Sequence, residues 1–277
     1  MDKTKRYLAN FFVNVPILFL SLTCIFPVVW LLYSSVKTDA EFNISPVNLP
    51  GKIHLDNYVK AFSRANFGTF AFNSLFNSII SLLLVLVISF ILGYLLSRYR
   101  FRGRNIVYGV LMAAMMVPIY ALIVPIFIQE KKLGLLNNYF SLIPIYVAME
   151  LPTSVFLIDS YIKGISVDLE DAASIDGASL PRTMFTIIMP ICRPILSTVV
   201  ILTFMHVWNE FPFAQVLISK EELKTIPLGL TYFTSQYSTS YTLLLAALAM
   251  ATIPVLIIYL FFYNKIMEGM MAGAVKG

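Results

Sequence analysis

The sequence predicts an all-α membrane protein with six transmembrane helices. Of its 277 residues, 58% are hydrophobic and only 13% are charged, which is about half the charged fraction of an ordinary soluble domain. Four runs contain no Asp, Glu, Lys or Arg, and each exceeds the roughly 20 apolar residues that a helix needs to cross the hydrocarbon layer. These runs are residues 7–36, 65–97, 105–129 and 225–264. Period-two alternation is not sustained, which disfavours a membrane β-barrel.

Two weaker candidate spans, which contain charged residues, lie between these runs and bring the expected number of spans to six. The fourth span contains Glu150 and Asp159, and the fifth contains Arg193 and Glu210. The first run is longer than the apolar region of a cleaved signal, and no small-residue cleavage site follows it, so we expect it to remain as a span. The expected spans are 11–36, 70–97, 105–129, 139–162, 190–218 and 241–263.

The distribution of Lys and Arg predicts the orientation. With both termini on one side, 12 of the 20 Lys and Arg residues fall on that side. Because positive charge stays in the cytoplasm, we expect both termini to be cytoplasmic. The basic run RYRFRGRN then marks a juxtamembrane stop rather than a nucleic-acid site. The expected parts are the termini 1–10 and 265–277, a six-span transmembrane domain over 11–264, an outer loop at 37–69 and a cytoplasmic loop at 163–189.

No arrangement of residues predicts catalysis or a cofactor. Cys24 and Cys192 are too few for a disulfide framework or a metal site, and His54 and His206 have no neighbours at ligand spacing. Gly51-Lys52 lacks the upstream glycine and the Ser/Thr of a phosphate loop, and no GxSxG elbow is present. We therefore expect no catalytic residue, no cofactor, no metal and no nucleic-acid partner in this chain.

The acidic segment LEDAASIDGASLPRTMFTIIMP at 169–190 interrupts the apolar pattern. Ser166 can cap a helix that starts at Val167, with acidic residues in its first turn, and Gly177 suits the position just past its end. A helix of about three turns is too short to cross a membrane. Spacings of three and four place Leu169, Ala172, Ala173 and Asp176 along one face, whose small side chains allow close approach by another molecule. An ordinary loop and a protein-docking helix both fit these observations.

The same segment resembles the cytoplasmic "EAA" motif of ABC import permeases. That motif is an acid and two alanines, then three residues and a glycine, then Ile-x-x-Pro near the next span. Here it reads Asp171-Ala172-Ala173, Gly177 and Ile187-Ile188-Met189-Pro190. Asp171 replaces the usual glutamate, although Glu170 precedes it, and Met189-Pro190 replaces the common Leu-Pro.

Three more segments resemble the carbohydrate branch of these permeases, so the resemblance covers nearly the whole chain. They are NLPGKIHLDNYVKAF at 48–62, WNEF at 208–211 with ELKTIPLGL at 222–230, and GMMAGAVKG at 269–277. On these motifs the sequence is similar to an inner permease subunit of the maltose/multiple-sugar uptake family, with its six-span type I importer fold. The resemblance implies a bacterial inner-membrane location, with residues 11–264 as the permease domain.

The resemblance implies partners and a mechanism. A second homologous permease completes the translocation path, two identical ATPase subunits bind ATP and Mg and hydrolyse the ATP, and an extracytoplasmic binding protein delivers the sugar. The short helix at about 167–177 becomes a coupling helix that docks in a groove of the ATPase. The tail near Gly273 to Gly277 reaches towards the ATPase interface. The docking residues implied are Glu170, Asp171, Ala172, Ala173, Asp176 and Gly177.

A candidate substrate path lies on the fifth span. His206, Asn209 and Glu210 share one stripe of it, with Trp208 adjacent, and an intramembrane acid that faces lipid is costly. Contact with a sugar and interhelical hydrogen bonding both remain open. The substrate is a sugar or oligosaccharide by resemblance, with glycerol-phosphate or another polyol as the alternative. A secondary transporter would need coupling groups such as Glu150, but inverted halves are not visible.

Overall fold

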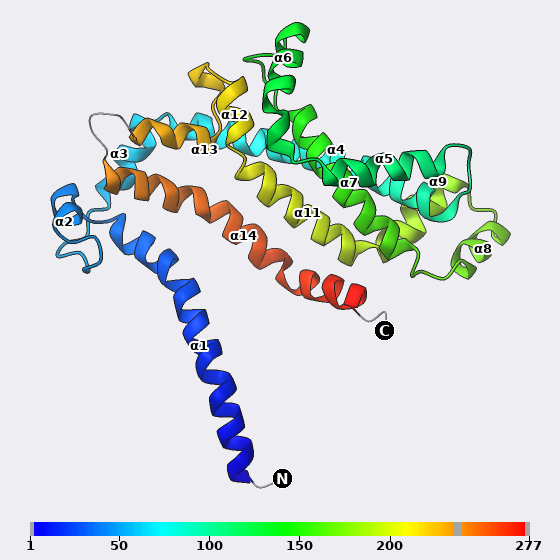
Figure 1. Ribbon diagram of the computed structural model, residues 1–277, viewed down its shortest axis with the longest axis horizontal. Helices are drawn as coiled ribbons and strands as arrows, with labels where there is room; N and C mark the ends of the chain where they lie inside the picture. The colour runs from blue at the N-terminus through cyan, green and yellow to red at the C-terminus, as the bar shows by residue number, and fades with distance from the viewer. Residues whose placement is uncertain (1–2, 235–239, 275–277) are drawn as a thin grey trace. The chain divides into compact units, whose positions relative to one another are not determined.

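The fold is all-helical among the described residues, which confirms the predicted class (Figure 1). The structure, a computed structural model, describes the backbone of residues 3–234 and 240–274 and the side chains of residues 12–234 and 240–261. In the described part of the chain, four helices are long and apolar enough to cross a membrane, and they coincide with the first, second, fourth and sixth expected spans; two bent helix pairs bring the number to six if each pair is one span. These are α1 (Lys3–Ser34), α4 (Phe67–Arg98), α7 (Ile143–Ile162) and α14 (Tyr241–Ala274).

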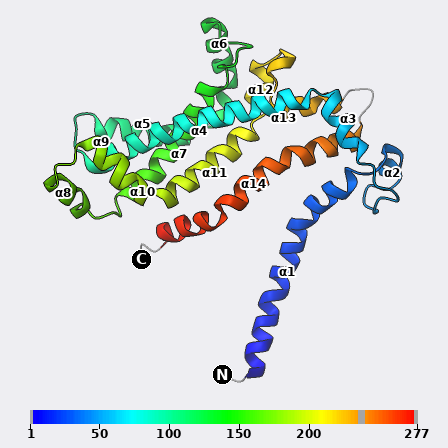
Figure 2. The same ribbon diagram turned by 180° about the vertical axis from the view of Figure 1, so that it is seen from behind.

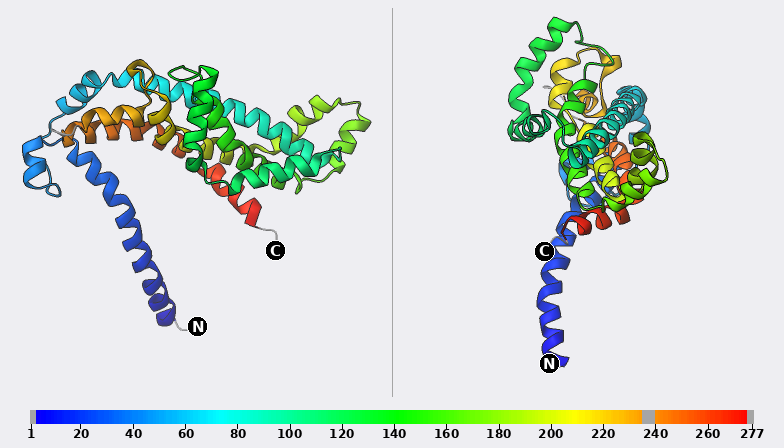
Figure 3. Two further views of the ribbon diagram at one scale, coloured as in Figure 1. Left: turned by 45° about the horizontal axis from the view of Figure 1, so that its top comes forward. Right: turned by 90° about the vertical axis from the view of Figure 1, so that its right-hand side faces the viewer.

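The first span, α1, remains one helix although it contains Pro16 and Pro27 (Figure 3). The apolar stretch of Phe12–Ser34 is not buried within this chain. Because an apolar surface of that length is unfavourable in water, lipid or another protein chain must cover it.

The third expected span, 105–129, is sharply bent rather than straight. The chain instead forms α5 (Arg104–Met116), η1 (Ile119–Leu122) and α6 (Ile123–Leu133), with a 94° bend between the two arms. Pro118 explains the break, because a proline has no N–H to donate and disfavours helical backbone in the residue before it. Val117 accordingly has extended backbone angles of −80° and 123°.

The fifth expected span, 190–218, is bent near its start and interrupted before its end. The helical arms 180–191 and 193–208 meet at an angle of 79° at Cys192, where Pro194 removes a helical hydrogen bond and its ring would clash with the carbonyl of Pro190. The first arm contains a stretch of wide π-helix in its middle. The segments are α9 (Leu180–Arg182), η2 (Thr183–Ile188), α10 (Met189–Ile191), α11 (Arg193–Trp208) and, after a break, α12 (Pro212–Leu217).

The chain forms two compact units, and each is described by itself. The first comprises residues 1–67 and 230–253 and therefore contains nearly all of the expected 37–69 loop. Part of that loop is helical, in α2 and α3, and the short turn η4 follows later in the chain. Their bounds are Asp39–Ile44 for α2, Asp56–Arg64 for α3 and Leu230–Phe233 for η4.

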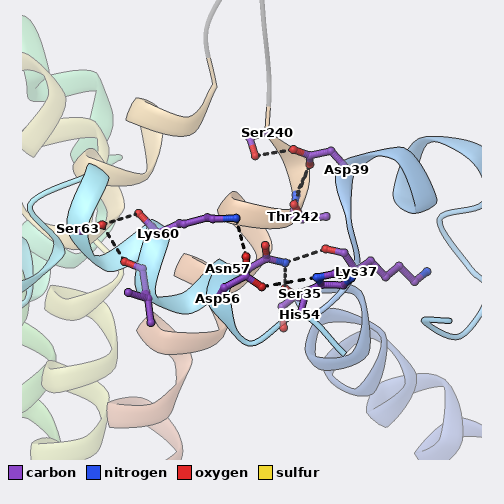
Figure 4. Close-up of polar contacts among 11 residues, drawn as sticks. Ser35, Lys37, Asp39, His54, Asp56, Asn57, Lys60, Ser63, Ser240 and Thr242 are labelled. Carbon is purple, nitrogen blue, oxygen red and sulfur yellow. Dashed lines mark hydrogen bonds and ion pairs between the residues drawn. The ribbon is translucent and has the colours of Figure 1, made fainter. Parts of the chain in front are cut away.

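Hydrogen bonds hold the loop in place within the first unit (Figure 4). Asp39 accepts from the backbone N–H and the hydroxyl of Thr242, at 3.1 and 2.8 Å, and from the hydroxyl of Ser240 at 2.9 Å. The side-chain amide of Asn57 donates to the backbone oxygens of Ser35 and Lys37, at 2.9 and 2.7 Å. Backbone groups that would otherwise be orphaned thus have partners, so the loop is a folded part of the unit.

The second unit comprises residues 68–229 and 254–277. Its core joins α4, α7, the arm at 180–191 and α11, whose side chains pack into one cluster. A second cluster joins α7 and α12. The remaining helices of the unit are α8 (Asp168–Ile175), η3 (Glu221–Leu223) and α13 (Ile226–Gly229). Residues 275–277 of the expected tail lie outside the described residues, and the division into termini and permease domain stays a prediction.

The helices α4 and α7 approach closely at Gly93. A Cβ added to Gly93 would lie 2.8 Å from Ile158 Cγ2 and 3.2 Å from the backbone nitrogen of Asp159. Real Cβ atoms do not come so close, so glycine is required at this crossing. The contact sets the spacing of α4 from the final turns of α7.

Candidate functional site

The acidic segment forms a short helix, α8, at one end of the second unit (Figures 1 and 2). It spans Asp168–Ile175, just over two turns, so the expectation of about three turns over 167–177 is too long. Ser166 supports its start, because the hydroxyl accepts a hydrogen bond from the backbone N–H of Asp168 at 3.2 Å. Gly177 follows its end with φ +76°, which confirms the expected glycine stop.

The two faces of α8 have different surroundings. Ala173 is 6% exposed and therefore faces the rest of its own unit, so the expectation that it shares an open face with Leu169 and Ala172 is wrong. Ile175 is 87% exposed and Leu169 is 45% exposed. The exposed residues of the helix and its end are Asp168, Leu169, Asp171, Ala172, Ser174, Ile175, Asp176 and Gly177.

Glu170 is bound by its own chain. One carboxylate oxygen accepts from Arg98 Nε at 2.5 Å and the other from the hydroxyl of Tyr94 at 2.7 Å. Arg98 Nη2 also donates to the backbone oxygen of Ile165 at 2.8 Å. The side chains of Arg98 and Glu170 are only 10% and 12% exposed. Glu170 therefore joins α8 to α4, and its expected placement on a partner-docking face is not what the structure shows.

Sequence reasoning missed Tyr94 and Arg98 as members of this site. The sequence indicates Arg98 only as part of the basic juxtamembrane run. Glu170 lies 72 residues further along the chain, and no local pattern in the sequence links the two residues. The available signal was weak: Tyr94 and Arg98 are four residues apart, so they share the face of one helix.

The polar stripe of the fifth span is divided between exposed and buried side chains. His206 Nδ1 lies 3.0 Å from Glu150 Oε1, which comes from α7. The side chain of His206 is 63% exposed and that of Glu150 only 9%. Asn209 is exposed, and its amide donates to the backbone oxygen of Met205 at 2.8 Å. His206 and Asn209 are therefore the members of the stripe that another molecule can reach.

Glu210 is buried and engaged within the unit. Its carboxylate accepts from the hydroxyl of Tyr146 at 2.8 Å and from the backbone N–H groups of Phe213 and Ala214 at 2.6 and 3.2 Å. Acceptors at a helix N-terminus satisfy N–H groups that lack intrahelical partners. Glu210 thus holds the start of α12 against α7.

Trp208 is buried as well. Its ring stacks on that of Phe204 with centroids 5.3 Å apart, and the residue is 3% exposed. In this structure the indole has no open face for a sugar ring.

The described residues contain no group of three or more His, Cys, Asp or Glu side chains that could hold a metal ion. That this chain carries no cofactor stays a prediction.

Comparison with known proteins identifies the family. Residues 85–267 match the family described as "Binding-protein-dependent transport system inner membrane component". The "Putative ABC transporter permease protein ORF2" of Caldicellulosiruptor sp. is 36% identical over 252 residues, which cover 91% of each chain.

Other relatives carry the names of carbohydrate systems. The "Sulfoquinovosyl glycerol transport system permease protein SmoH" of Agrobacterium fabrum is 32% identical over 280 residues, which cover 99% of this chain and 98% of the relative. The "Arabinooligosaccharides transport system permease protein AraQ" of Bacillus subtilis is 32% identical over 262 residues, which cover 93% and 92%.

A solved structure has the same fold. It is described as a bacterial ABC transporter involved in the import of the acidic polysaccharide alginate, and it superimposes with a TM-score of 0.81 over 95% of this chain and 98% of its own. At 23% identity this likeness shows the fold alone. The family match covers well over half of the residues, so the chain belongs to the family of binding-protein-dependent transport system inner membrane components.

Proposed function

We propose that the chain is one of two homologous permease subunits of an ABC importer that takes up a sugar or oligosaccharide. An extracytoplasmic binding protein delivers the substrate, and two ATPase subunits bind and hydrolyse ATP with Mg on the cytoplasmic side. The chain itself is not an enzyme. Its family membership and the names of its relatives support this assignment.

The open face of α8 is the observation that carries the proposal. Leu169, Ala172 and Ile175 are apolar and exposed on a helix whose first turn is acidic. A large exposed isoleucine beside an alanine provides the shape and the apolar area that a partner's groove can bury. We infer that this face is the ATPase-docking surface and that Glu170 and Ala173 anchor α8 to its own chain.

The inferred side of the membrane agrees with this role. Arg98 ends α4 and begins the basic run 98–104, and it contacts Glu170 within α8. Because Lys and Arg concentrate in cytoplasmic loops, α8 and both termini belong on the cytoplasmic side, where ATP is available.

The exposed members of the polar stripe support a role in the translocation path. His206 and Asn209 point out of a membrane-spanning segment, where contact with lipid would cost several kcal/mol for an ionisable group. These side chains avoid the cost of contact with lipid if they face a water-filled path or the second permease. We propose that His206 and Asn209 line the path, that Glu150 orients His206, and that Glu210 and Trp208 are structural.

The substrate class is tested by uptake. Deleting the gene should abolish binding-protein-dependent uptake of one carbohydrate in a panel of labelled monosaccharides, oligosaccharides and glycerol phosphates. Restoring the intact gene should restore it. If uptake of glycerol phosphate alone were lost, the polyol alternative would replace the sugar. If uptake of every compound were unchanged, the proposed substrate class would be wrong.

A further inference from the structure

We propose that Tyr94 and Arg98 form a tether through Glu170 that makes α4 move together with α8. Here the tether means these three side chains. The inference rests on the proposed docking role of α8. It adds the contacts through which a movement of α8 is transmitted to the membrane-spanning helix α4.

The connectivity of the chain shows why a tether matters. The residues on either side of α8 lead to α7 and to the arm at 180–191, so a displacement of α8 reaches those two segments through covalent bonds. The helix α4 precedes α8 by 70 residues or more and has no such link. Side-chain contacts of Glu170 link α8 to α4 directly, whereas a displacement that passes through α7 or the 180–191 arm reaches α4 only through the packing of those segments on it.

The tether has the geometry of a fixed joint. Glu170 uses both carboxylate oxygens, one on Arg98 Nε and one on the Tyr94 hydroxyl. Charge-assisted hydrogen bonds of this kind are stronger than neutral ones and restrict orientation. Arg98 also donates to the backbone oxygen of Ile165, so the same side chain holds both the helix and the loop that leads into it.

Burial makes the joint hard to open. Arg98 and Glu170 are 10% and 12% exposed, and separating two nearly buried charges leaves each without its partner. Tyr94 is itself buried in the cluster that joins α4, α7, the 180–191 arm and α11. Gly93, the residue before Tyr94 on α4, packs directly on α7. The end of α4 is therefore held at two points: the charge pair resists movement of α8 relative to α4, and the close packing at Gly93 resists movement of α7 relative to α4.

Charge reversal in the intact complex tests the tether. Arg98→Glu and Glu170→Arg should each leave ATPase co-purification close to wild type, because the open face of α8 is unchanged. Each should reduce sugar uptake and binding-protein-stimulated ATPase activity about tenfold, within the range that double-mutant cycles report for residues in contact. The double variant should recover most of the activity. Arg100→Glu is the matched control, since it changes the same charge on an exposed neighbour, and it should leave uptake unaltered.

A covalent replacement provides a second test that does not depend on reversed charges. In a background with Cys24→Ser and Cys192→Ser, the pair Arg98→Cys and Glu170→Cys removes the ion pair and should impair uptake. Joining the two cysteines with a short bis-methanethiosulfonate linker should restore uptake, because α4 and α8 are expected to move as one body. Reducing the linker should impair uptake again.

The outcomes separate the tether from the docking role. If both single reversals kept full uptake, if the double variant were no better than the singles, or if the linker left uptake impaired, the tether would be wrong. A purely stabilising contact would instead lower assembly and uptake in parallel. If docking itself were wrong, Ile175→Asp would leave the ATPase bound. If only the tether were wrong, Ile175→Asp would release the ATPase while Arg98→Glu left uptake intact.

Discussion

His206 Nδ1 lies 3.0 Å from Glu150 Oε1, which joins an exposed imidazole on α11 to a buried carboxylate on α7. The carboxylate fixes the ring while the rest of the imidazole stays open. An oriented polar group in a membrane-spanning helix indicates a surface that another subunit or water covers.

His206→Ala should weaken substrate use without affecting assembly. Losing one hydrogen bond to a sugar costs about 0.5–1.5 kcal/mol, which corresponds to an increase in the KM of uptake of about 2- to 13-fold. Initial rates of uptake across sugar concentrations in an assembled complex measure this. Leu202→Ala, one turn earlier on the exposed side of α11, is the control. Unchanged affinity and rate for His206→Ala would make the pair purely structural.

Glu210→Ala should reduce stability rather than affinity. The substitution leaves the backbone N–H groups of Phe213 and Ala214 and the Tyr146 hydroxyl without their acceptor, and each unsatisfied buried group costs about 1–3 kcal/mol. The yield of folded complex and its thermal midpoint in detergent should fall, while the KM of the surviving complex stays near wild type. A complex of normal stability with an altered KM would place Glu210 in the substrate path.

Gly177→Ala should weaken ATPase association by distorting the end of α8. The residue has φ +76°, and a residue with a Cβ pays about 1–2 kcal/mol in that conformation. Binding of the purified ATPase to the permease pair measures the effect. Gly109→Ala is the control, because Gly109 lies inside α5 with open space around its Cβ position, and alanine is favourable in a helix. Equal binding by the two variants would show that the glycine stop does not position the docking face.

Impermeant thiol reagents should distinguish the two sides of the membrane. Single cysteines at Asn48 and Lys224 should react in intact cells, and one at Gly177 should react only after the membrane is opened. The parent must lack Cys24 and Cys192. The Lys and Arg distribution is the basis of this expectation, so labelling of position 177 from outside would invert the proposed topology.

The sequence predicts the helical fold and four of the spans because long uncharged runs have few alternatives in a membrane. The angles of the bends at Pro118 and Cys192 do not follow from the sequence, since proline in a membrane helix is often tolerated and the surrounding packing decides whether the helix breaks. The position of α8 and its glycine stop followed from local rules of helix capping.

The partners of Glu170 and of Glu210 could not be predicted. Glu170 meets Arg98 across 72 residues, and Glu210 meets Tyr146 across 64, and a single sequence carries no signal for such pairs. The prediction that Ala173 lies on the open face of α8 is also wrong. A helix of two turns with small residues on several sides has no clear inner face until its neighbours are known.

The most direct test of the central claim is the affinity of the ATPase for a permease pair that carries Ile175→Asp. Ile175 is 87% exposed on the open face of α8, and truncating or charging an apolar contact at the centre of an interface commonly costs about 2 kcal/mol or more. Ile44→Asp is the matched control, since Ile44 is 85% exposed in the 37–69 loop on the side expected to face away from the ATPase. The account predicts that Ile175→Asp releases the ATPase and abolishes uptake while Ile44→Asp keeps it bound. Full ATPase binding by the Ile175→Asp complex would contradict it.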